Sequence, residues 1–324
     1  MALVTYGVAK MTPEKRNTPV EEKPAQPPPP APGPLNLSTE LAPGTIIVDQ
    51  YRVDATLGGG GMGSVYRCTD MMVNRSVAIK FLHPHLLVTS KWSLRFQQEA
   101  KAIGRLRHPN IIQLHQFSAG HESPFIVMDY VEGVPLSDVL SKETKLSVVR
   151  TVQIMSQVAS ALAHAHENGV VHRDLKPSNI IVVEGTQDEV KILDFGIAKI
   201  SDEDLTPAQL TQTGEVFGSP NYMSPEQCAG KKIDSRSDQY SFGCVLFECL
   251  TGTPPFASDS PIQLMMQQIS EAPPTLKEAS LGQRFPEHLE QICKKLLAKA
   301  PENRFDNMDQ VGRVLRSAED VTLT

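Results

Sequence analysis

The chain has 324 residues, of which 40% are hydrophobic, so it is long enough for one large or two ordinary domains with a sizeable core. Its formal net charge of −6 argues against nucleic acid or an anionic membrane as the main partner. The sequence holds no apolar run of the length, about 18 residues, that spans a bilayer. Its five cysteines form no C-x-x-C motif, which argues against a disulfide framework or a zinc site and favours a reducing, cytoplasmic location.

Residues 1–43 differ in composition from the rest of the chain. They include "EEKPAQPPPPAPGPL", a proline-rich run that is nearly free of large apolar side chains. Such a segment cannot bury enough surface to offset the entropy lost on ordering, so we expect it to be disordered, with polyproline II character. A folded domain is expected over residues 44–316, followed by a short tail over residues 317–324.

The first part of this domain, about residues 44–130, is predicted to consist mostly of strands with one prominent helix. Strand patterns occur at 51–57, 64–70, 76–82, 111–117 and 124–131. The second and third of these are joined as a hairpin by "MMVNR". The helix is predicted over 89–110, ending at Pro109, with Glu99, Ile103 and Leu106 on one face.

The second part, about residues 131–316, is predicted to be mainly helical. Apolar residues at helical spacing predict a helix in "SVVRTVQIMSQVASALAHAHENG", residues 147–169, with Gly169 at its C-terminal end. A short hairpin is predicted from "NIIVV" and "VKIL", and the pattern is helical from about residue 226 onward. A strand-rich part followed by a helix-rich part predicts two lobes with a cleft between them.

A glycine-rich stretch, "LGGGGMGSVY" at residues 57–66, lies between two strand patterns. Gly58, Gly60 and Gly63 match G-x-G-x-x-G. In a dinucleotide-binding fold this motif opens a helix, whereas here a strand pattern follows, which argues against a nicotinamide-dependent oxidoreductase. A turn between antiparallel strands fits better, because backbone N–H groups without side chains can approach phosphate oxygens closely.

The sequence "VAIK" adds a second element to this region. Ala78 and Lys80 are two residues apart and share one face of their strand. If that face meets the cleft, Ala78 leaves room for a flat base and Lys80 reaches phosphates. A buried lysine needs a counter-charge, and Glu99 on the inward face of the predicted helix is the expected partner.

Six motifs together resemble a Hanks-type, eukaryotic-like serine/threonine protein kinase of the bacterial style. In order, they are "GGGGMGSV", "VAIK", Glu99, "HRDLKPSN", "DFG" and "SPE", and the resemblance covers about residues 45–315. It implies an α+β fold with two lobes: a small antiparallel sheet with one helix over about 44–130, and a larger, mainly helical lobe over about 131–316. It also implies transfer of the γ-phosphate of ATP to serine and threonine hydroxyls of proteins, with Mg²⁺ or Mn²⁺.

The resemblance assigns roles to individual residues. Asp174 would accept the proton of the substrate hydroxyl, Lys176 would lie beside the γ-phosphate, and Lys80 would pair with Glu99. Asn179 and Asp194 would bind the metal ion through hard oxygen atoms, which suit Mg²⁺ or Mn²⁺. The expected nucleotide-binding residues are Leu57, Gly58, Gly60, Gly63, Val65, Ala78, Lys80, Met128, Asp129, Val131 and Ile181, with Met128 gating the back pocket and the backbone of Asp129 and Val131 binding adenine.

The long polar segment between Asp194 and Glu226 is typical of an activation segment. Thr211 and Thr213 are the expected sites of autophosphorylation, because Arg173 directly precedes Asp174 and can pair with a phosphate. The resemblance also allows a homodimer that phosphorylates itself in trans.

Four further features concern the substrate-docking loop and its support. Ser219 stands where the family usually has threonine in this loop, and Ser224 stands where it has the alanine of A-P-E. The resemblance pairs Glu226 with Arg304 and has Asp238 brace the backbone of the catalytic loop.

Rival functions remain open at this point. A pseudokinase that binds nucleotide without transferring phosphate is the main alternative, although Lys80, Asp174, Asn179 and Asp194 are all present. A small-molecule or lipid kinase should lack the peptide-docking "GSPNYMSPE". Kinases of this style often continue into a membrane span and a sensor, so the full-length protein could be membrane-anchored.

Overall fold

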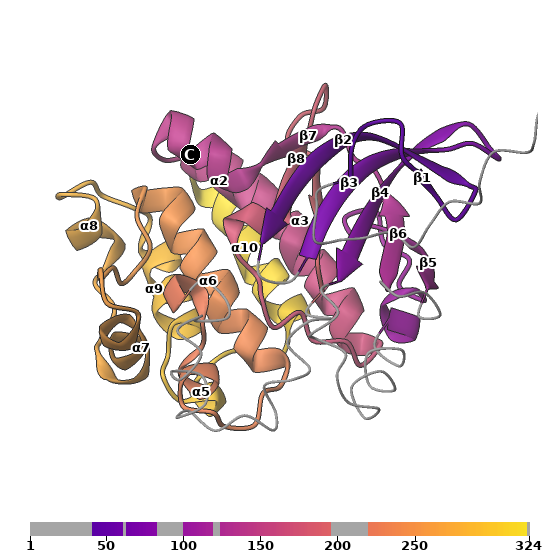
Figure 1. Cartoon of the computed structure of the whole chain (residues 1–324). Helices are drawn as coiled ribbons and strands as arrows, with labels where there is room; N and C mark the ends of the chain where they lie inside the picture. The colour runs from indigo at the N-terminus through magenta and orange to yellow at the C-terminus, as the bar shows by residue number, and fades with distance from the viewer. Residues whose placement is uncertain (1–40, 61–62, 83–99, 119–123, 196–219, 323–324) are drawn as a thin grey trace, which may run out of the picture. The chain divides into compact units, whose positions relative to one another are not determined.

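A computed structural model of the chain describes residues 41–60, 63–82, 100–118, 124–195 and 220–322 (Figure 1). The chain divides into two compact units, Met1–Leu35 and Asn36–Thr324, and every described element belongs to the second. Glu99, Thr211, Thr213 and Ser219 lie outside the described residues, as does most of the proline-rich segment.

The first part of the second unit is an antiparallel sheet of six strands in the order β1-β2-β3-β4-β6-β5. The strands are β1 (Ile46–Ile47), β2 (Tyr51–Gly60), β3 (Gly63–Asp70), β4 (Arg75–Leu82), β5 (Leu114–Ser118) and β6 (Phe125–Asp129). The predicted hairpin is confirmed, because β3 and β4 pair from Gly63 opposite Leu82 to Asp70 opposite Arg75. Packing starts before β1, since Leu41 is buried and its N–H donates to the Tyr66 hydroxyl at 3.1 Å, although residues 1–43 were expected to be disordered.

The predicted helix before β5 is described only over residues 100–103. The chain then turns, and residues 106–108 are not helical, so the prediction that the helix runs to Pro109 was wrong. Tertiary contacts explain the difference. The N–H of Arg107 donates to Nε2 of His164 at 3.3 Å, and Ile111 forms a bridge with Ile192, so this segment is held by distant parts of the chain.

A second, smaller sheet follows β6 and carries the residues of interest. Its three antiparallel strands, β7 (Gly133–Pro135), β8 (Ile180–Val183) and β9 (Val190–Ile192), pair in chain order. The predicted hairpin of 179–183 with 190–193 is thus confirmed as β8 and β9. The short 3-10 turn η2 (Pro177–Asn179) leads into β8, and Asp194 comes directly after Leu193, at the end of β9.

The other described elements of the unit are helices, and the predicted helical character from about residue 226 onward is confirmed (Figure 1). They are α2 (Leu136–Glu143), α3 (Val148–Glu167), α5 (Pro225–Cys228), α6 (Ser235–Thr251), α7 (Pro261–Ser270), α8 (Leu276–Ala279), α9 (Glu287–Leu296) and α10 (Met308–Thr322), with the 3-10 turns η4 (Pro220–Tyr222) and η5 (Pro301–Asn303). Among the helices described, none has both the length and the apolar character that crossing a membrane would require.

Two helices, α3 and α6, form the centre of the helical core. Ser147 caps α3 by accepting a hydrogen bond from the Arg150 N–H, and Gly169, at a φ of +74°, follows its last turn. Helix α6 is buried on nearly all sides and contacts α3, α9, α8 and η4. At Gly243 a Cβ atom would lie 2.8 Å from Cβ of Leu296, so glycine allows α6 and α9 to approach closely.

Candidate active site

The glycine-rich hairpin lies in the same sheet as Lys80. Across β2, β3 and β4, Gly58 pairs with Val65, and Val65 pairs with Lys80. Gly63, at a φ of +145°, adopts a backbone conformation that favours glycine. A Cβ atom at Gly58 would meet no described atom within 4 Å, so packing within this part of the chain does not require glycine there. The open space is instead compatible with a ligand beside the hairpin.

Lys80 forms an ion pair with Asp194, from a part of the chain 114 residues away. The Nζ atom of Lys80 lies 2.8 Å from Oδ2 of Asp194, and the two side chains are 14% and 37% exposed. Sequence reasoning expected Glu99 as the partner of Lys80. Glu99 lies outside the described residues, so that pairing stays a prediction. Among the described residues the ammonium group contacts Asp194, whose backbone adopts a φ of +49°. One basic group of the β-sheet is therefore held against one acidic group beside β9.

Three further predicted residues lie together in the loop that leads into β8. Nζ of Lys176 is 3.0 Å from Oδ2 of Asp174. The side-chain amide of Asn179 donates to the backbone carbonyl of Asp174 at 2.8 Å. The carbonyl of Asn179 in turn accepts from the N–H of Leu193 at 2.8 Å. This last contact ties the loop to the residue that precedes Asp194, so the two groups of side chains are linked through the backbone.

Asp238 of α6 holds the start of this loop from the buried core. Its Oδ2 accepts from the N–H of His172 at 2.7 Å, and its Oδ1 accepts from the N–H of Arg173 at 2.8 Å. Arg173 has a φ of +64°, and this fixed carboxylate helps to hold that unfavourable conformation. Burial alone would raise the pKa of Asp238, but the contact with His166 at 2.7 Å and the His172 N–H hold its pKa below the usual value.

His172 is a buried, neutral imidazole. The N–H of Asp174 donates to Nδ1 of His172 at 3.2 Å, so Nδ1 carries no proton. Nε2 therefore carries the proton and donates to the carbonyl of Leu193 at 3.0 Å. Burial lowers the pKa of His172, against the charges of Asp238, Asp174 and Asp194, which raise it. The ring contacts the Phe195 ring, with centroids 4.7 Å apart and planes tilted by 50°, and thereby joins the loop to the residue after Asp194.

The residues expected to surround a base are brought together only in part. Ala78 and Met128 pair across β4 and β6 and form a buried cluster with Ile112 and Ile126. Val131 and Leu193 pack against this cluster from its edge. Leu193 was missed from the sequence, although it directly precedes the D-F-G motif, which is the signal that could have found it.

The other expected base-site residues lie outside this cluster. Ile181 is in β8, opposite Lys191 and Pro135, and Leu57 is 48% exposed in β2. The N–H of Asp129 already donates to the carbonyl of Gln113 at 3.0 Å, so its N–H group is occupied within the protein. Any contact of the Asp129 backbone with a base would therefore use its carbonyl.

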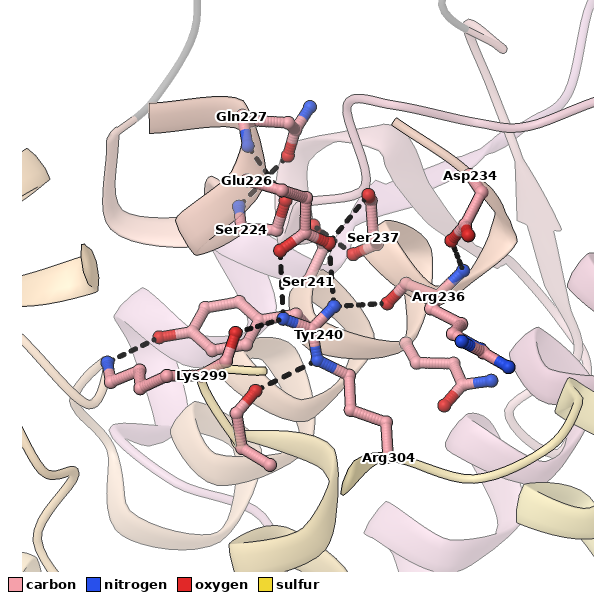
Figure 2. A network of polar contacts seen from close by, with 12 residues as sticks. Ser224, Glu226, Gln227, Asp234, Arg236, Ser237, Tyr240, Ser241, Lys299 and Arg304 are labelled. Carbon is pink, nitrogen blue, oxygen red and sulfur yellow. Dashed lines mark hydrogen bonds and ion pairs between the residues drawn. The ribbon is translucent and has the colours of Figure 1, made fainter. Parts of the chain in front are cut away.

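A buried ion pair joins Glu226 of α5 to Arg304 (Figure 2). NH1 of Arg304 is 2.7 Å from Oε1 of Glu226, and NH2 is 2.9 Å from Oε2, which is a bidentate pair. The Ser237 hydroxyl donates to the same carboxylate at 2.7 Å. Burial would raise the pKa of Glu226, but the hydrogen bonds and charge of Arg304 hold its pKa below the usual value.

Gln227 was not singled out from the sequence, although S-x-x-Q from Ser224 to Gln227 is the signature of a capping box. The structure contains this box at the start of α5, with the Ser224 N–H donating to Oε1 of Gln227 at 2.9 Å. The amide group of Gln227 also donates to the carbonyl of Arg173 at 2.7 Å. The serine that departs from the family pattern therefore anchors a residue that reaches the catalytic loop.

Comparison with known proteins agrees with this arrangement. Residues 51–313 match the protein kinase domain family. The chain is 43% identical over 264 residues to the serine/threonine-protein kinase pkn3 of Myxococcus xanthus, which covers 81% of this chain and 48% of pkn3. It is 39% identical over 264 residues to the serine/threonine-protein kinase PknB of Mycobacterium tuberculosis, covering 79% of this chain and 41% of PknB. The chain thus spans less than half the length of these curated relatives.

The fold has a similar solved structure, the crystal structure of the Mycobacterium tuberculosis PknI kinase domain. The two share 26% sequence identity and a TM-score of 0.67, over 86% of this chain and 100% of that domain. The predicted α+β fold with a sheet-containing lobe and a helical lobe is therefore confirmed. On the extent of the match and the identity to its relatives, the chain belongs to the protein kinase family, in the Hanks-type serine/threonine branch found in bacteria.

Proposed function

We propose that this chain transfers the γ-phosphate of ATP to serine and threonine hydroxyls of protein substrates. The observation that carries the proposal is the convergence of Lys80, Asp174, Lys176, Asn179 and Asp194 from two lobes of the fold. Phosphoryl transfer depends mainly on positioning and on neutralising charge over the transferred group. Two ammonium groups, two carboxylates and one amide in linked positions suit that task.

The acidic and amide groups suit a hard divalent cation. The Nδ2 group of Asn179 is engaged by the carbonyl of Asp174, so the remaining side-chain atom, Oδ1, is the oxygen that Asn179 can offer. Asp194 supplies a carboxylate that is 37% exposed and so accessible from solvent. Mg²⁺ or Mn²⁺ held by these oxygens would neutralise phosphate charge. The Lys80 ammonium group would either leave Asp194 and contact the phosphates or contact Asp194 and the phosphates together.

Asp174 is the group proposed to accept the proton of the substrate hydroxyl. Its carboxylate is kept beside Lys176, whose Nζ lies 3.0 Å from Oδ2 of Asp174. The backbone of the loop is fixed by Asp238 on one side and Asn179 on the other. The base is therefore preorganised by the fold, which is the main contribution that the protein can make to this reaction.

Phosphate transfer from labelled ATP tests the proposal. In the presence of Mg²⁺ and a generic basic protein, the wild-type chain is expected to form phosphoserine and phosphothreonine, and chelation by EDTA should abolish the reaction. Asp174→Asn should lower kcat by at least about 100-fold while nucleotide binding persists. The pseudokinase alternative predicts nucleotide binding with no transfer by the wild-type chain, and that result would overturn the proposal.

We further propose activation by autophosphorylation of Thr211 and Thr213. The T-x-T spacing and the position of Arg173 next to the proposed base support this regulation. Mass spectrometry of the active chain should find phosphate on at least one of the two threonines, and none in Asp174→Asn. Thr206→Ala, in the same segment, serves as the matched control for Thr211→Ala and Thr213→Ala. Finding both threonines unmodified in active enzyme contradicts the proposal. A rate per molecule that rises with protein concentration shows transfer in trans between two copies of the chain, and a dimer in sedimentation measurements at the same concentrations would support the homodimer.

A further inference from the structure

The backbone of η4, at the end of the predicted substrate-docking loop, is held by side chains of two helices. The side-chain amide of Gln268, in α7, donates to the carbonyls of Pro220 at 3.0 Å and Asn221 at 2.8 Å. The Ser241 hydroxyl, in α6, donates to the carbonyl of Tyr222 at 2.7 Å. Three consecutive carbonyl groups therefore have fixed side-chain donors. These donors hold the backbone of η4 in one path.

Gln268 is buried, and every polar atom of its side chain is used. Its two N–H groups serve Pro220 and Asn221, and its Oε1 accepts from the Tyr240 hydroxyl at 2.6 Å. Because a buried amide is costly unless it is hydrogen-bonded, these partners fix it in one orientation. Gln268 thus connects Tyr240 of α6 directly to the backbone of the docking loop at Pro220 and Asn221.

Lys299 anchors the same network from the other side. Its Nζ donates to the Tyr240 hydroxyl at 3.1 Å, the contact drawn in Figure 2, and to the carbonyls of Gln267 at 3.2 Å and Gln268 at 2.9 Å. These two carbonyls lie in the last turn of α7, where a cation is favourable. The ammonium also lies 4.3 Å from the centroid of the Phe256 ring. The last turn of α7 is thereby fixed to α6.

The other end of the docking region is fixed to the catalytic loop. Gln227 donates to the carbonyl of Arg173, the residue before Asp174. Residues 220–227 are therefore held between Gln268 and the proposed base. None of the hydrogen bonds of the Gln268 side chain involves Lys80, Asn179 or Asp194. We therefore expect a change at Gln268 to affect the docking region and not the residues proposed to bind the nucleotide and the metal ion.

We propose that Gln268 is a positioning residue for the protein substrate, which sets the place of the docking loop relative to Asp174 and thereby the affinity for the acceptor protein. This inference rests on the proposed function, because it assigns a determinant of protein-substrate binding. Tyr240 and Lys299 orient Gln268 and belong to the same hydrogen-bond network. The chemical class of the ligand is a polypeptide carrying serine or threonine.

Steady-state kinetics of Gln268→Met tests the proposal, because methionine keeps the shape of glutamine and removes all its hydrogen bonds. With the generic basic protein as acceptor, the KM for that protein should rise about tenfold, a change equivalent to about one lost hydrogen-bond contribution of 1.4 kcal/mol. The KM for ATP and kcat should each change by less than about threefold. Gln263→Met, at an exposed position of the same helix, is the matched control and should match the wild type.

Two outcomes overturn the inference. One is an unchanged KM for the protein substrate in folded Gln268→Met. The other is a fall in kcat together with similar rises in the KM for the protein and the KM for ATP and a lowered Tm, which marks a purely structural role. If Gln268→Met does not fold, Tyr240→Phe decides, since it removes the hydroxyl that orients Gln268 and should raise the KM for the protein about threefold. A wild-type chain that transfers no phosphate defeats the proposed function itself, whereas an active wild type with an unaltered variant defeats only this inference.

Discussion

Gln227 donates a hydrogen bond from its side-chain amide to the backbone carbonyl of Arg173 at 2.7 Å. The oxygen of the same amide accepts from the N–H of Ser224, so one side chain serves both the start of α5 and the catalytic loop. The position of Asp174 therefore depends on how α5 begins. Together with the Asp238 carboxylate, this contact leaves the backbone around Arg173 little freedom to move.

The variant Gln227→Glu separates the two roles of this side chain. A carboxylate still accepts from the Ser224 N–H and keeps the capping box, but it has no donor for the Arg173 carbonyl and repels it. We expect kcat to fall about tenfold through misplacement of the base, with a loss of about 1 kcal/mol in the free energy of unfolding. Gln227→Ala also loses the acceptor for the Ser224 N–H, while the Ser224 hydroxyl keeps its contact with the backbone N–H of residue 227, so it should be about 1 kcal/mol less stable again. A kcat of Gln227→Glu within twofold of the wild type contradicts this account.

Substitution of Arg304 tests the contribution of its buried ion pair with Glu226 to stability. All its N–H groups have acceptors: Nε contacts the carbonyl of Ala298, NH1 the carbonyl of Arg236 and Glu226, and NH2 Glu226 and the carbonyl of Lys299. Arg304→Lys should therefore lower the free energy of unfolding by about 3–5 kcal/mol despite the retained charge, because one ammonium cannot replace a planar fork. Urea unfolding measures this loss.

The double variant Glu226→Leu with Arg304→Met is the control for the pair. Since it leaves no unpaired buried charge, it should cost less than Arg304→Met alone. If the double variant is instead less stable than Arg304→Met, the prediction is wrong. The ion pair would then stabilise the fold by more than the cost of leaving one charge unpaired.

Local sequence signals predicted those elements whose boundaries depend on local chemistry. The hairpin of β3 and β4 and the helix α3 were found because alternation, a turn and a helix end mark them within a few residues. The helix predicted to reach Pro109 ends by residue 103 because Arg107 and Ile111 contact α3 and β9, from 57 and 81 residues farther along the chain. A local pattern does not contain such distant partners.

The same distinction applies to the candidate site. Asp174, Lys176 and Asn179 stand close together in the sequence, and the structure keeps them close. The contact between Lys80 and Asp194 joins residues 114 positions apart, and no local pattern indicated it. The predicted pairing of Lys80 with Glu99 stays a prediction, because Glu99 lies outside the described residues. Gln268 was overlooked because a glutamine in an amphipathic helix has no distinguishing sequence pattern. Its role follows only from the packing of α7 against η4.

The neutral state of His172 predicts a specific dependence of stability on pH. Because burial lowers its folded-state pKa below the unfolded value of about 6.5, the unfolded chain binds more protons between the two values. Its contribution to stability is therefore present above about pH 6.5 and is lost as the pH falls toward the folded pKa. NMR of ¹⁵N-histidine-labelled protein should show one protonated and one bare ring nitrogen for His172 at pH 6. In urea the same imidazole should titrate near 6.5, and a doubly protonated ring in the folded protein at pH 6 contradicts the assignment.

Lys80→Met separates a catalytic from a structural role for the ion pair with Asp194. Both side chains are partly exposed, so their ion pair should contribute no more than about 1 kcal/mol to stability. If Lys80 neutralises phosphate charge, its loss should lower kcat/KM by at least about 100-fold while the free energy of unfolding changes by less than about 1 kcal/mol. Arg150→Met is the matched control, because Arg150 forms similar partly exposed ion pairs with Glu143 and Asp188, and it should cost stability without changing the rate of transfer. Equal losses of activity in the two variants would show that Lys80 acts through the fold. Loss of a phosphate-binding group lowers kcat/KM far more than it lowers the free energy of unfolding, whereas loss of a structural ion pair affects mainly the free energy of unfolding.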